Sequence, residues 1–189
     1  MQDILIGDDY FSHPELIRQL GLSYTDYKHS EEQEEVGWKG WRTPAPQAIN
    51  EGIFDILEKA YKIKKEDFVC TPYFHIAYEN TKGYCDFPNA KWHVDNSDYA
   101  GLVYLNEDPP KKSGTCLIDG TNNDIITVDN VFNRVVAYPS HYYHAPEDLF
   151  GDSDDKESGR MTLTFFLWGN DNPYKSKAME WIRVLDIED

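Results

Sequence analysis

The sequence predicts a mostly β protein of the α+β class, an antiparallel sandwich or jelly roll with N-terminal helices packed on one sheet. Helix-period patterns occur near the N-terminus, whereas segments rich in aromatic and β-branched residues follow from Phe68 onward. Turn-forming segments such as 106–110 separate these strand-like segments. No long helical pattern alternates with them, so a parallel βαβ sheet is disfavoured.

The chain length predicts one domain spanning residues 1–189, because 189 residues bury one core but are too few for two. Within it we expect three parts: a mixed helical N-terminal segment that wraps the core over residues 1–67, a jelly-roll core over 68–170 and a C-terminal tail over 171–189.

Each predicted element has a local reason in the sequence. Residues 3–7 form a short strand, and a helix opens at His13-Pro14-Glu15 and ends at Gly21. Residues 23–43 lack periodicity, and their Trp38 and Trp41 either cover a pocket or pack onto the core. A second helix over 47–61 carries an apolar stripe of Ile49, Ile53, Phe54, Leu57, Ala60 and Tyr61. The expected strands are 68–78, 99–105, 115–118, 131–138 and 160–168, and a short helix is expected at 178–185.

Charge and cysteine content exclude several classes of function. The chain has 34 acidic and 18 basic side chains, a formal net charge of −16, so nucleic acid and anionic membranes are disfavoured partners. The local basic run 62–65 fits a solvated helix end. Three scattered cysteines without a CxxC pair indicate a reducing compartment, and residues 1–8 lack a secretory pattern. No apolar run reaches the length of a membrane span. We therefore expect a soluble, cytoplasmic protein.

The His-x-Asp motif at His93 and Asp95 is the first candidate for chemistry. Residues two positions apart on a strand project from one face, so an imidazole and a carboxylate there can bind one divalent metal. A further histidine would complete a 2-His-1-carboxylate set suited to Fe(II). His141 and His144 are candidates, and on an extended strand only one of them can enter the pocket.

Arg160 opens an otherwise apolar strand and is the second candidate. Its planar guanidinium matches a carboxylate, and Thr162 shares its face of the strand. The alternative is an Arg that is exposed or paired with a protein carboxylate.

Taken in order, these motifs resemble the Fe(II)/2-oxoglutarate-dependent oxygenases, and most closely their prolyl-hydroxylase-like branch. The resemblance covers residues 68–170, through His93-Val94-Asp95-Asn96, Val103-Tyr104-Leu105-Asn106, Ser113-Gly114-Thr115, 139–144 and Arg160. It implies a double-stranded β-helix and makes 68–170 the catalytic core.

The resemblance also implies the roles of individual residues. His93, Asp95 and His144 would bind Fe(II), with His144 preferred to His141 because Pro146 follows it by two positions. Arg160, Thr162, Tyr104 and Tyr78 would bind the co-substrate 2-oxoglutarate, with O₂ as the oxidant. Candidates for the pocket lining are Phe74, Trp92, Leu102 and Phe166.

The implied activity is hydroxylation of a C–H bond in a peptide side chain or a free amino acid, with release of succinate and CO₂. Asp95 argues against the halogenase variant, which lacks this ligand, and Phe166 stands where nucleic-acid demethylases carry a second Arg. The acidic insert 152–157 would lie at the pocket rim. Two alternatives remain: a small-metabolite oxygenase, and a non-catalytic metal-binding jelly-roll module.

Overall fold

The protein is described here by a computed structural model, which covers residues 3–29, 40–79, 92–118, 124–180 and 182. Its α-helices are α1 (Pro14–Ser23), α2 (Asn50–Tyr61) and α3 (Lys175–Met179), with 3₁₀ turns at Gln47–Ile49, Lys65–Asp67 and Lys156–Ser158. The strands are β1 (Leu5–Gly7), β2 (Lys28–His29), β3 (Trp41–Pro44), β4 (Phe68–Ala77), β5 (Tyr99–Tyr104), β6 (Thr115–Ile118), β7 (Ile125–Val128), β8 (Val135–Pro139), β9 (Tyr143–Pro146) and β10 (Arg160–Gly169).

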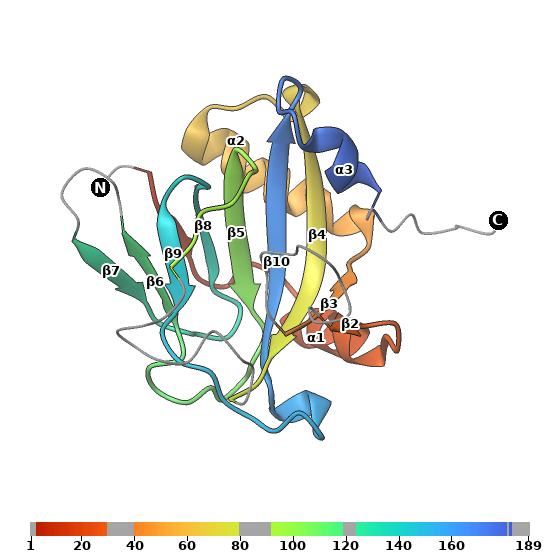
Figure 1. Ribbon diagram of the computed structural model, residues 1–189, viewed down its shortest axis with the longest axis vertical. Helices are drawn as coiled ribbons and strands as arrows, with labels where there is room; N and C mark the ends of the chain where they lie inside the picture. Colours follow the sequence, from red (N-terminus) through yellow and green to blue (C-terminus); the bar gives the residue numbers. More distant parts are fainter. Residues whose placement is uncertain (1–2, 30–39, 80–91, 119–123, 181, 183–189) are drawn as a thin grey trace.

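Among the described residues the strands form two antiparallel sheets, as expected for a jelly-roll-like fold. The larger sheet has the order β1-β8-β5-β10-β4-β3-β2, and the smaller has the order β7-β6-β9. Figure 1 shows the long strands β4 and β10 at the centre of the larger sheet, with β6, β7 and β9 to one side. The molecule is therefore sheet-rich, with its longest strands in the middle.

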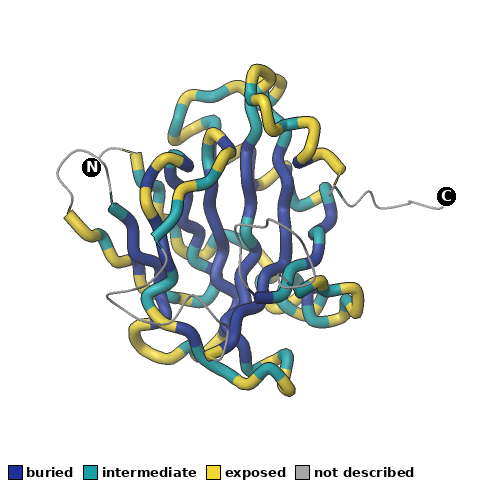
Figure 2. Tube along the Cα trace, in the orientation of Figure 1, coloured by how far each residue is buried: buried dark blue, intermediate teal, exposed yellow. Residues whose placement is uncertain are grey.

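The side chains of β10 pack on both faces of the larger sheet, where they belong to two separate hydrophobic clusters. Met161, Leu163, Phe165 and Leu167 are fully buried in a hydrophobic cluster that also contains Ile53 and Leu57 of α2. The alternate residues of β10 face the other way, toward the smaller sheet, because successive strand residues point to opposite faces. Figure 2 shows the continuous burial of β4, β5 and β10 that results.

Several element boundaries differ from those expected. The predicted strand 131–138 starts at Val135, because Asn133 has a positive φ of 65° and its side-chain amide bonds the backbone of Phe11. The short strands β2, β3, β7 and β9 were not predicted. The tail helix is Lys175–Met179, and residues 183–185 of the predicted helix lie outside the described residues.

Two further expectations concern the N-terminal part. Trp41 packs against the hydrophobic cluster, with its ring centroid 4.9 Å from that of Tyr78, so it is a core residue; Trp38 lies outside the described residues. None of the helices within the described ranges is long and apolar enough to cross a bilayer. The division into parts at residues 67 and 170 stays a prediction.

Candidate active site

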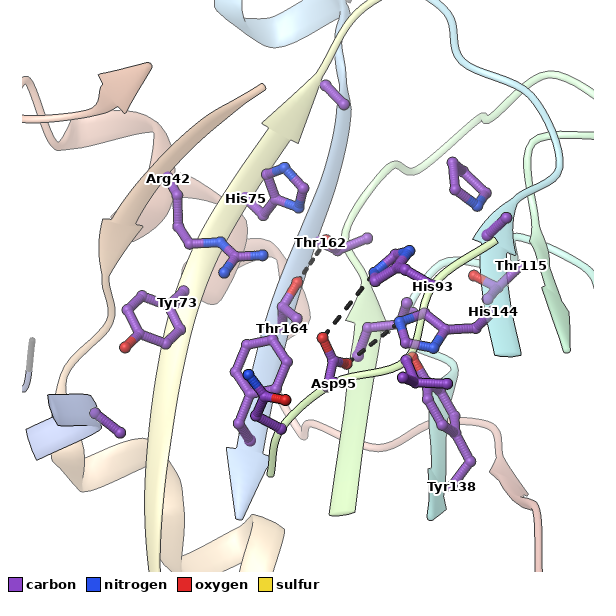
Figure 3. Close-up of a pocket in the computed structure, with 18 of the residues that line it drawn as sticks. Arg42, Tyr73, His75, His93, Asp95, Thr115, Tyr138, His144, Thr162 and Thr164 are labelled. Atoms are coloured by element: carbon purple, nitrogen blue, oxygen red, sulfur yellow. Dashed lines mark hydrogen bonds and ion pairs between the residues drawn. The ribbon is translucent and has the colours of Figure 1, made fainter. Parts of the chain in front are cut away.

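A cavity of about 420 Å³ lies between the inner face of the larger sheet and the smaller sheet. Its walls come from β3, β4, β5, β8 and β10 on one side, from β6 and β9 on the other, and from α3. Figure 3 shows the polar side chains that reach into it. This volume is toward the lower end of the range of about 300–1,000 Å³ usual for small-molecule sites.

His93, Asp95 and His144 converge in this cavity. One potential ligand atom from each of the three lies within 4.8 Å of the others. An Asp95 carboxylate oxygen is 3.3 Å from Nε2 of His144, and the other is 4.0 Å from Nε2 of His93. Two imidazole nitrogens and a carboxylate oxygen at this spacing form the donor set of a 2-His-1-carboxylate metal site.

The backbone of His93 and Asp95 is not part of a regular strand, although the motif was interpreted as lying on one. Instead, His93 forms an isolated antiparallel bridge with His144, with N–H···O bonds of 3.2 and 2.9 Å in the two directions. The amide of Asp95 donates to the carbonyl of Ser140 at 3.0 Å. The two motifs are therefore fixed to each other directly, although they are about fifty residues apart in the sequence.

A contact with the Tyr142 backbone helps to orient the ring of His144. Its Nδ1 lies 3.1 Å from the carbonyl oxygen of Tyr142, so Nδ1–H donates there and Nε2 faces Asp95. A carbonyl on the outer nitrogen is the usual means of fixing the tautomer of a metal-binding histidine. His141, by contrast, is exposed in the turn before β9 and lies outside the cavity.

The electrostatics of the three groups match a cation site. Burial alone raises the pKa of Asp95, but the imidazoles of His144 and His93 and the Arg42 guanidinium outweigh it, so the pKa is lowered. Burial alone lowers the pKa of His144, but the Asp95 carboxylate and the Tyr142 carbonyl leave it raised. The carboxylate is thus ionised and the site attracts positive charge.

Arg160 and Thr162 line the same cavity. Arg160 is 6% exposed; its Nε donates to the carbonyl of Ser113 at 2.9 Å, and its Nη2 to the carbonyl of Gly114 at 3.2 Å and to Thr115 Oγ1 at 3.1 Å. Among the described residues it forms no ion pair with a carboxylate. A buried guanidinium held by neutral groups is ready to accept an anion.

Neither Tyr104 nor Tyr78, both expected to bind the co-substrate, lines the cavity. Tyr104 is fully buried beside Arg160 but does not line the cavity; its hydroxyl donates to Thr115 Oγ1 at 2.7 Å. Tyr78 belongs to the hydrophobic cluster on the opposite face of the larger sheet. It follows Phe74 and Ile76 at two-residue intervals, and residues at this spacing point to the same face. The structure thus brings Tyr104 to the site as a neighbour of Arg160 and leaves Tyr78 outside.

Of the apolar candidates, Leu102 and Phe166 line the cavity, whereas Phe74 is core and Trp92 is not in the lining. The acidic insert 152–157 does not line it either. Lys156 donates from Nζ to the carbonyls of Leu22 and Tyr24, which fixes the insert to the end of α1.

The polar or aromatic groups of the cavity that sequence reasoning missed include Arg42, Tyr73, His75 and Thr164. Thr164 could have been found, since it repeats the two-residue spacing of Arg160 and Thr162. The others come from β3 and β4, and only the tertiary pairing of β3 with β4 brings Arg42 to the cavity.

Comparison with known proteins shows the fold. No protein-family model and no curated protein match the sequence. A prolyl-4-hydroxylase from Pseudomonas putida matches the structure with a TM-score of 0.63 at 11% identity, over 90% of this chain and 94% of that one.

Two further solved structures match in the same way. A Trichoplax adhaerens prolyl hydroxylase, in complex with a hypoxia-inducible factor peptide fragment, matches with a TM-score of 0.62 at 12% identity, over 95% and 87% of the two chains. HygX from Streptomyces hygroscopicus, with nickel and 2-oxoglutarate bound, matches with a TM-score of 0.57 at 12% identity, over 90% and 84%. The chain therefore has the fold of the prolyl-hydroxylase-like branch of the 2-oxoglutarate-dependent oxygenases.

Proposed function

We propose that the protein is an Fe(II)- and 2-oxoglutarate-dependent dioxygenase that hydroxylates a C–H bond. One observation carries this proposal: the His93–Asp95–His144 donor set and the buried Arg160 guanidinium face one cavity. A metal site alone has no use for a buried cation beside it, whereas a dicarboxylate co-substrate that binds the metal at one end needs such a cation at the other.

The donor set fits Fe(II). Two neutral imidazoles and one carboxylate occupy one side of a metal and leave the opposite positions open to small molecules. His144 is held in the required tautomer by Tyr142, and the lowered pKa of Asp95 keeps it anionic. HygX, which shares the fold, has been solved both with iron and with nickel and 2-oxoglutarate.

Arg160 fits the distal carboxylate of 2-oxoglutarate. Its Nε and Nη2 are held by the 113–115 segment, which fixes the plane of the guanidinium, and Thr162 adds a hydroxyl on the same strand face. Tyr104 supports this arrangement through Thr115. These residues orient the co-substrate, and they neither give nor take a proton.

The reaction balances as substrate C–H plus O₂ plus 2-oxoglutarate, giving substrate C–OH, succinate and CO₂. Bound iron would supply the activation of O₂, with 2-oxoglutarate as the reductant. The chain itself binds the three reactants, orients the C–H bond and lines the cavity with the apolar side chains of Leu102 and Phe166.

The substrate is a peptide side chain or a free amino acid. The prolyl hydroxylases that share the fold support the first, because one of them was solved with a peptide fragment. The cavity volume of about 420 Å³ supports the second, because a site of this size suits a small molecule.

A test of this function is succinate formation from 2-oxoglutarate by the Fe(II)-loaded protein, in Asp95→Ala compared with Asp108→Ala. Asp108 is an exposed carboxylate outside the cavity and makes a matched control. We expect Asp95→Ala to lose turnover by about 100-fold or more, since even outer-sphere partners of a metal contribute 10–100-fold. If Asp95→Ala consumes 2-oxoglutarate at the wild-type rate, the ligand assignment is wrong.

A further inference from the structure

Ser140 connects the two halves of the metal-binding set. Its carbonyl oxygen accepts the amide of Asp95 at 3.0 Å, and its own amide donates to the carbonyl of Asp98 at 3.1 Å. Its hydroxyl oxygen lies 2.6 Å from the hydroxyl oxygen of Ser97, at hydrogen-bond distance. The amide, the carbonyl and the hydroxyl of Ser140 therefore all contact the segment 95–98, which begins with a metal-binding residue.

The same short stretch of chain carries the other half of the set. Ser140 directly follows β8 and precedes His144 of β9 by four residues. His144 is bonded to His93 through the backbone in both directions. Figure 3 shows the result, with Asp95 facing the rings of His93 and His144. Because residues 93–98 belong to no regular strand, these contacts decide where the backbone of Asp95 lies relative to the two histidines.

The two serine hydroxyls are shielded from water. Ser140 is fully buried and Ser97 is 8% exposed. Neither residue lines the cavity, so neither hydroxyl meets a reactant there. A hydrogen bond between buried groups is costly to break, because no water replaces the lost partner.

The side-chain contacts on the other side of the segment are exposed. Nδ2 of Asn172 donates to the carbonyl of Asn96 at 3.0 Å and to a carboxylate oxygen of Asp98 at 3.0 Å. Water can take the place of either partner in such contacts, so each contributes little. The buried Ser97–Ser140 pair therefore constrains the segment more strongly than Asn172 does.

We propose that the Ser97–Ser140 hydroxyl pair positions the metal ligand Asp95. The two serines are positioning residues that act through the backbone of Asp95. Metal ligands must be held within about 0.5 Å of their binding geometry by the residues around them. The Asp95 side chain has only two rotatable bonds, so a fixed backbone largely fixes its carboxylate. The inference rests on the metal site of the proposed function and is independent of the oxidation.

The experiment measures metal binding by the full chain in the absence of 2-oxoglutarate and O₂. Co(II) is the probe, because its visible absorption depends on the geometry of its ligands. Titration with Co(II) gives the dissociation constant, and competition with a chelator gives that of Zn(II). Urea unfolding of the metal-free protein measures the stability of the same variants.

The variants are Ser97→Ala, Ser140→Ala, the double variant and the control Ile53→Val. Each single variant leaves one buried hydroxyl without its partner, whereas the double variant removes both and so costs less stability. Ile53 is fully buried on α2, in the hydrophobic cluster on the face of the larger sheet opposite the cavity. Ile53→Val therefore lowers stability without touching the segment 95–98. Circular dichroism establishes that each variant is folded.

We expect each serine variant to bind Co(II) about 10-fold more weakly, the lower end of the range for residues that support metal ligands, and to show an altered Co(II) spectrum. In the double variant the urea midpoint returns toward the wild-type value while the affinity for Co(II) stays low. Ile53→Val lowers the urea midpoint and binds Co(II) with wild-type affinity.

Three results would overturn the proposal. Wild-type affinity for Co(II) in the double variant would mean that the serine pair stabilises the fold without positioning Asp95. A Co(II) affinity that follows the urea midpoint across all the variants, Ile53→Val included, would assign the effect to stability alone. Failure of the wild type to bind Co(II) or Zn(II) would remove the metal site itself.

Failure of this inference is distinct from failure of the proposed function. Weakened Co(II) binding in the serine variants of a protein that consumes no 2-oxoglutarate would support the role of the pair and contradict the oxygenase. Succinate formation by the wild type, together with unchanged Co(II) affinity in the serine variants, would contradict the role of the pair and leave the oxygenase intact.

Discussion

At the scale of single residues, neutral hydrogen-bonding groups position the Arg160 guanidinium in the site. The Tyr104 hydroxyl donates to Thr115 Oγ1, and Thr115 Oγ1 accepts from Arg160. Burial is the largest influence on Tyr104 and raises the pKa of its hydroxyl, so the phenol stays neutral. Tyr104 is therefore a positioning residue for the guanidinium.

Tyr104→Phe tests this chain of contacts. We expect the variant to raise KM for 2-oxoglutarate several-fold with little change in kcat, and to lower the free energy of unfolding by about 1–2 kcal/mol, because Thr115 and the Val128 carbonyl lose a buried partner. Steady-state kinetics and urea unfolding measure the two effects. Tyr143→Phe, at an exposed tyrosine, is the control. An unchanged KM in Tyr104→Phe would show that Arg160 holds its position alone.

The residues of the site divide into those that sequence reasoning can find and those that it cannot. Residue type and spacing made His93, Asp95 and Arg160 candidates, and the resemblance then assigned their roles. The choice of His144 over His141 needed the resemblance. The alternation of side chains along a strand shows only that the two histidines cannot both enter the pocket. Arg42 had no signal, because its segment lacks periodicity and reaches the cavity through long-range pairing.

At the scale of elements, β5 packs closely against its two neighbouring strands in the larger sheet, β8 and β10. Gly101 on β5 lies opposite Phe165 of β10 and beside β8. A methyl group added there would stand 2.3 Å from Cζ of Phe165 and 2.5 Å from the Val136 carbonyl oxygen. The strand can approach its neighbours only because this position has no side chain.

Gly101→Ala should therefore be strongly destabilising. We expect the free energy of unfolding to fall by about 2–3 kcal/mol, the usual effect of overpacking a core. Gly169→Ala, at the end of β10, is the comparison, because its added methyl meets nothing closer than 3.3 Å. Urea unfolding of both variants measures the difference. Equal stability of the two would mean that β5 and β10 shift apart without penalty.

Element prediction succeeded where strands are long and buried on both faces. The strands β4, β5 and β10 follow from runs of aromatic and β-branched residues. The four-residue strand β6 was also predicted, but the strands β2, β3, β7 and β9, of two to four residues, were not, because such short segments seldom show the alternation from which a strand is inferred. Two of these, β3 and β9, supply Arg42 and His144, so the least predictable elements carry part of the site.

At the scale of the whole molecule, buried tyrosines link stability to pH. Burial raises the pKa of Tyr78 to about 12, and burial likewise raises the pKa values of Tyr10 and Tyr61. An unfolded tyrosine titrates near 10. Above pH 10 the folded state therefore holds more protons than the unfolded state, so the free energy of unfolding decreases as pH rises.

We expect the urea midpoint to fall progressively as pH rises above about 10. The measurement is made at high salt, which screens repulsion arising from the net charge of −16. Tyr78→Phe makes the fall shallower and, because Tyr78 lies outside the cavity, leaves the affinity for 2-oxoglutarate unchanged. A midpoint that rises or stays level up to pH 11 would contradict the burial of these hydroxyls.

The proposed function requires His93, Asp95 and His144 to bind iron with 2-oxoglutarate beside it. Anaerobic titration of the Fe(II)-loaded protein with 2-oxoglutarate tests this most directly. A weak visible charge-transfer band should appear in the wild type and in His141→Ala, and should be absent in His144→Ala. The two histidines are three positions apart, one exposed and one in the cavity, so the pair is closely matched. Absence of the band in the wild type, or its persistence in His144→Ala, would contradict the account.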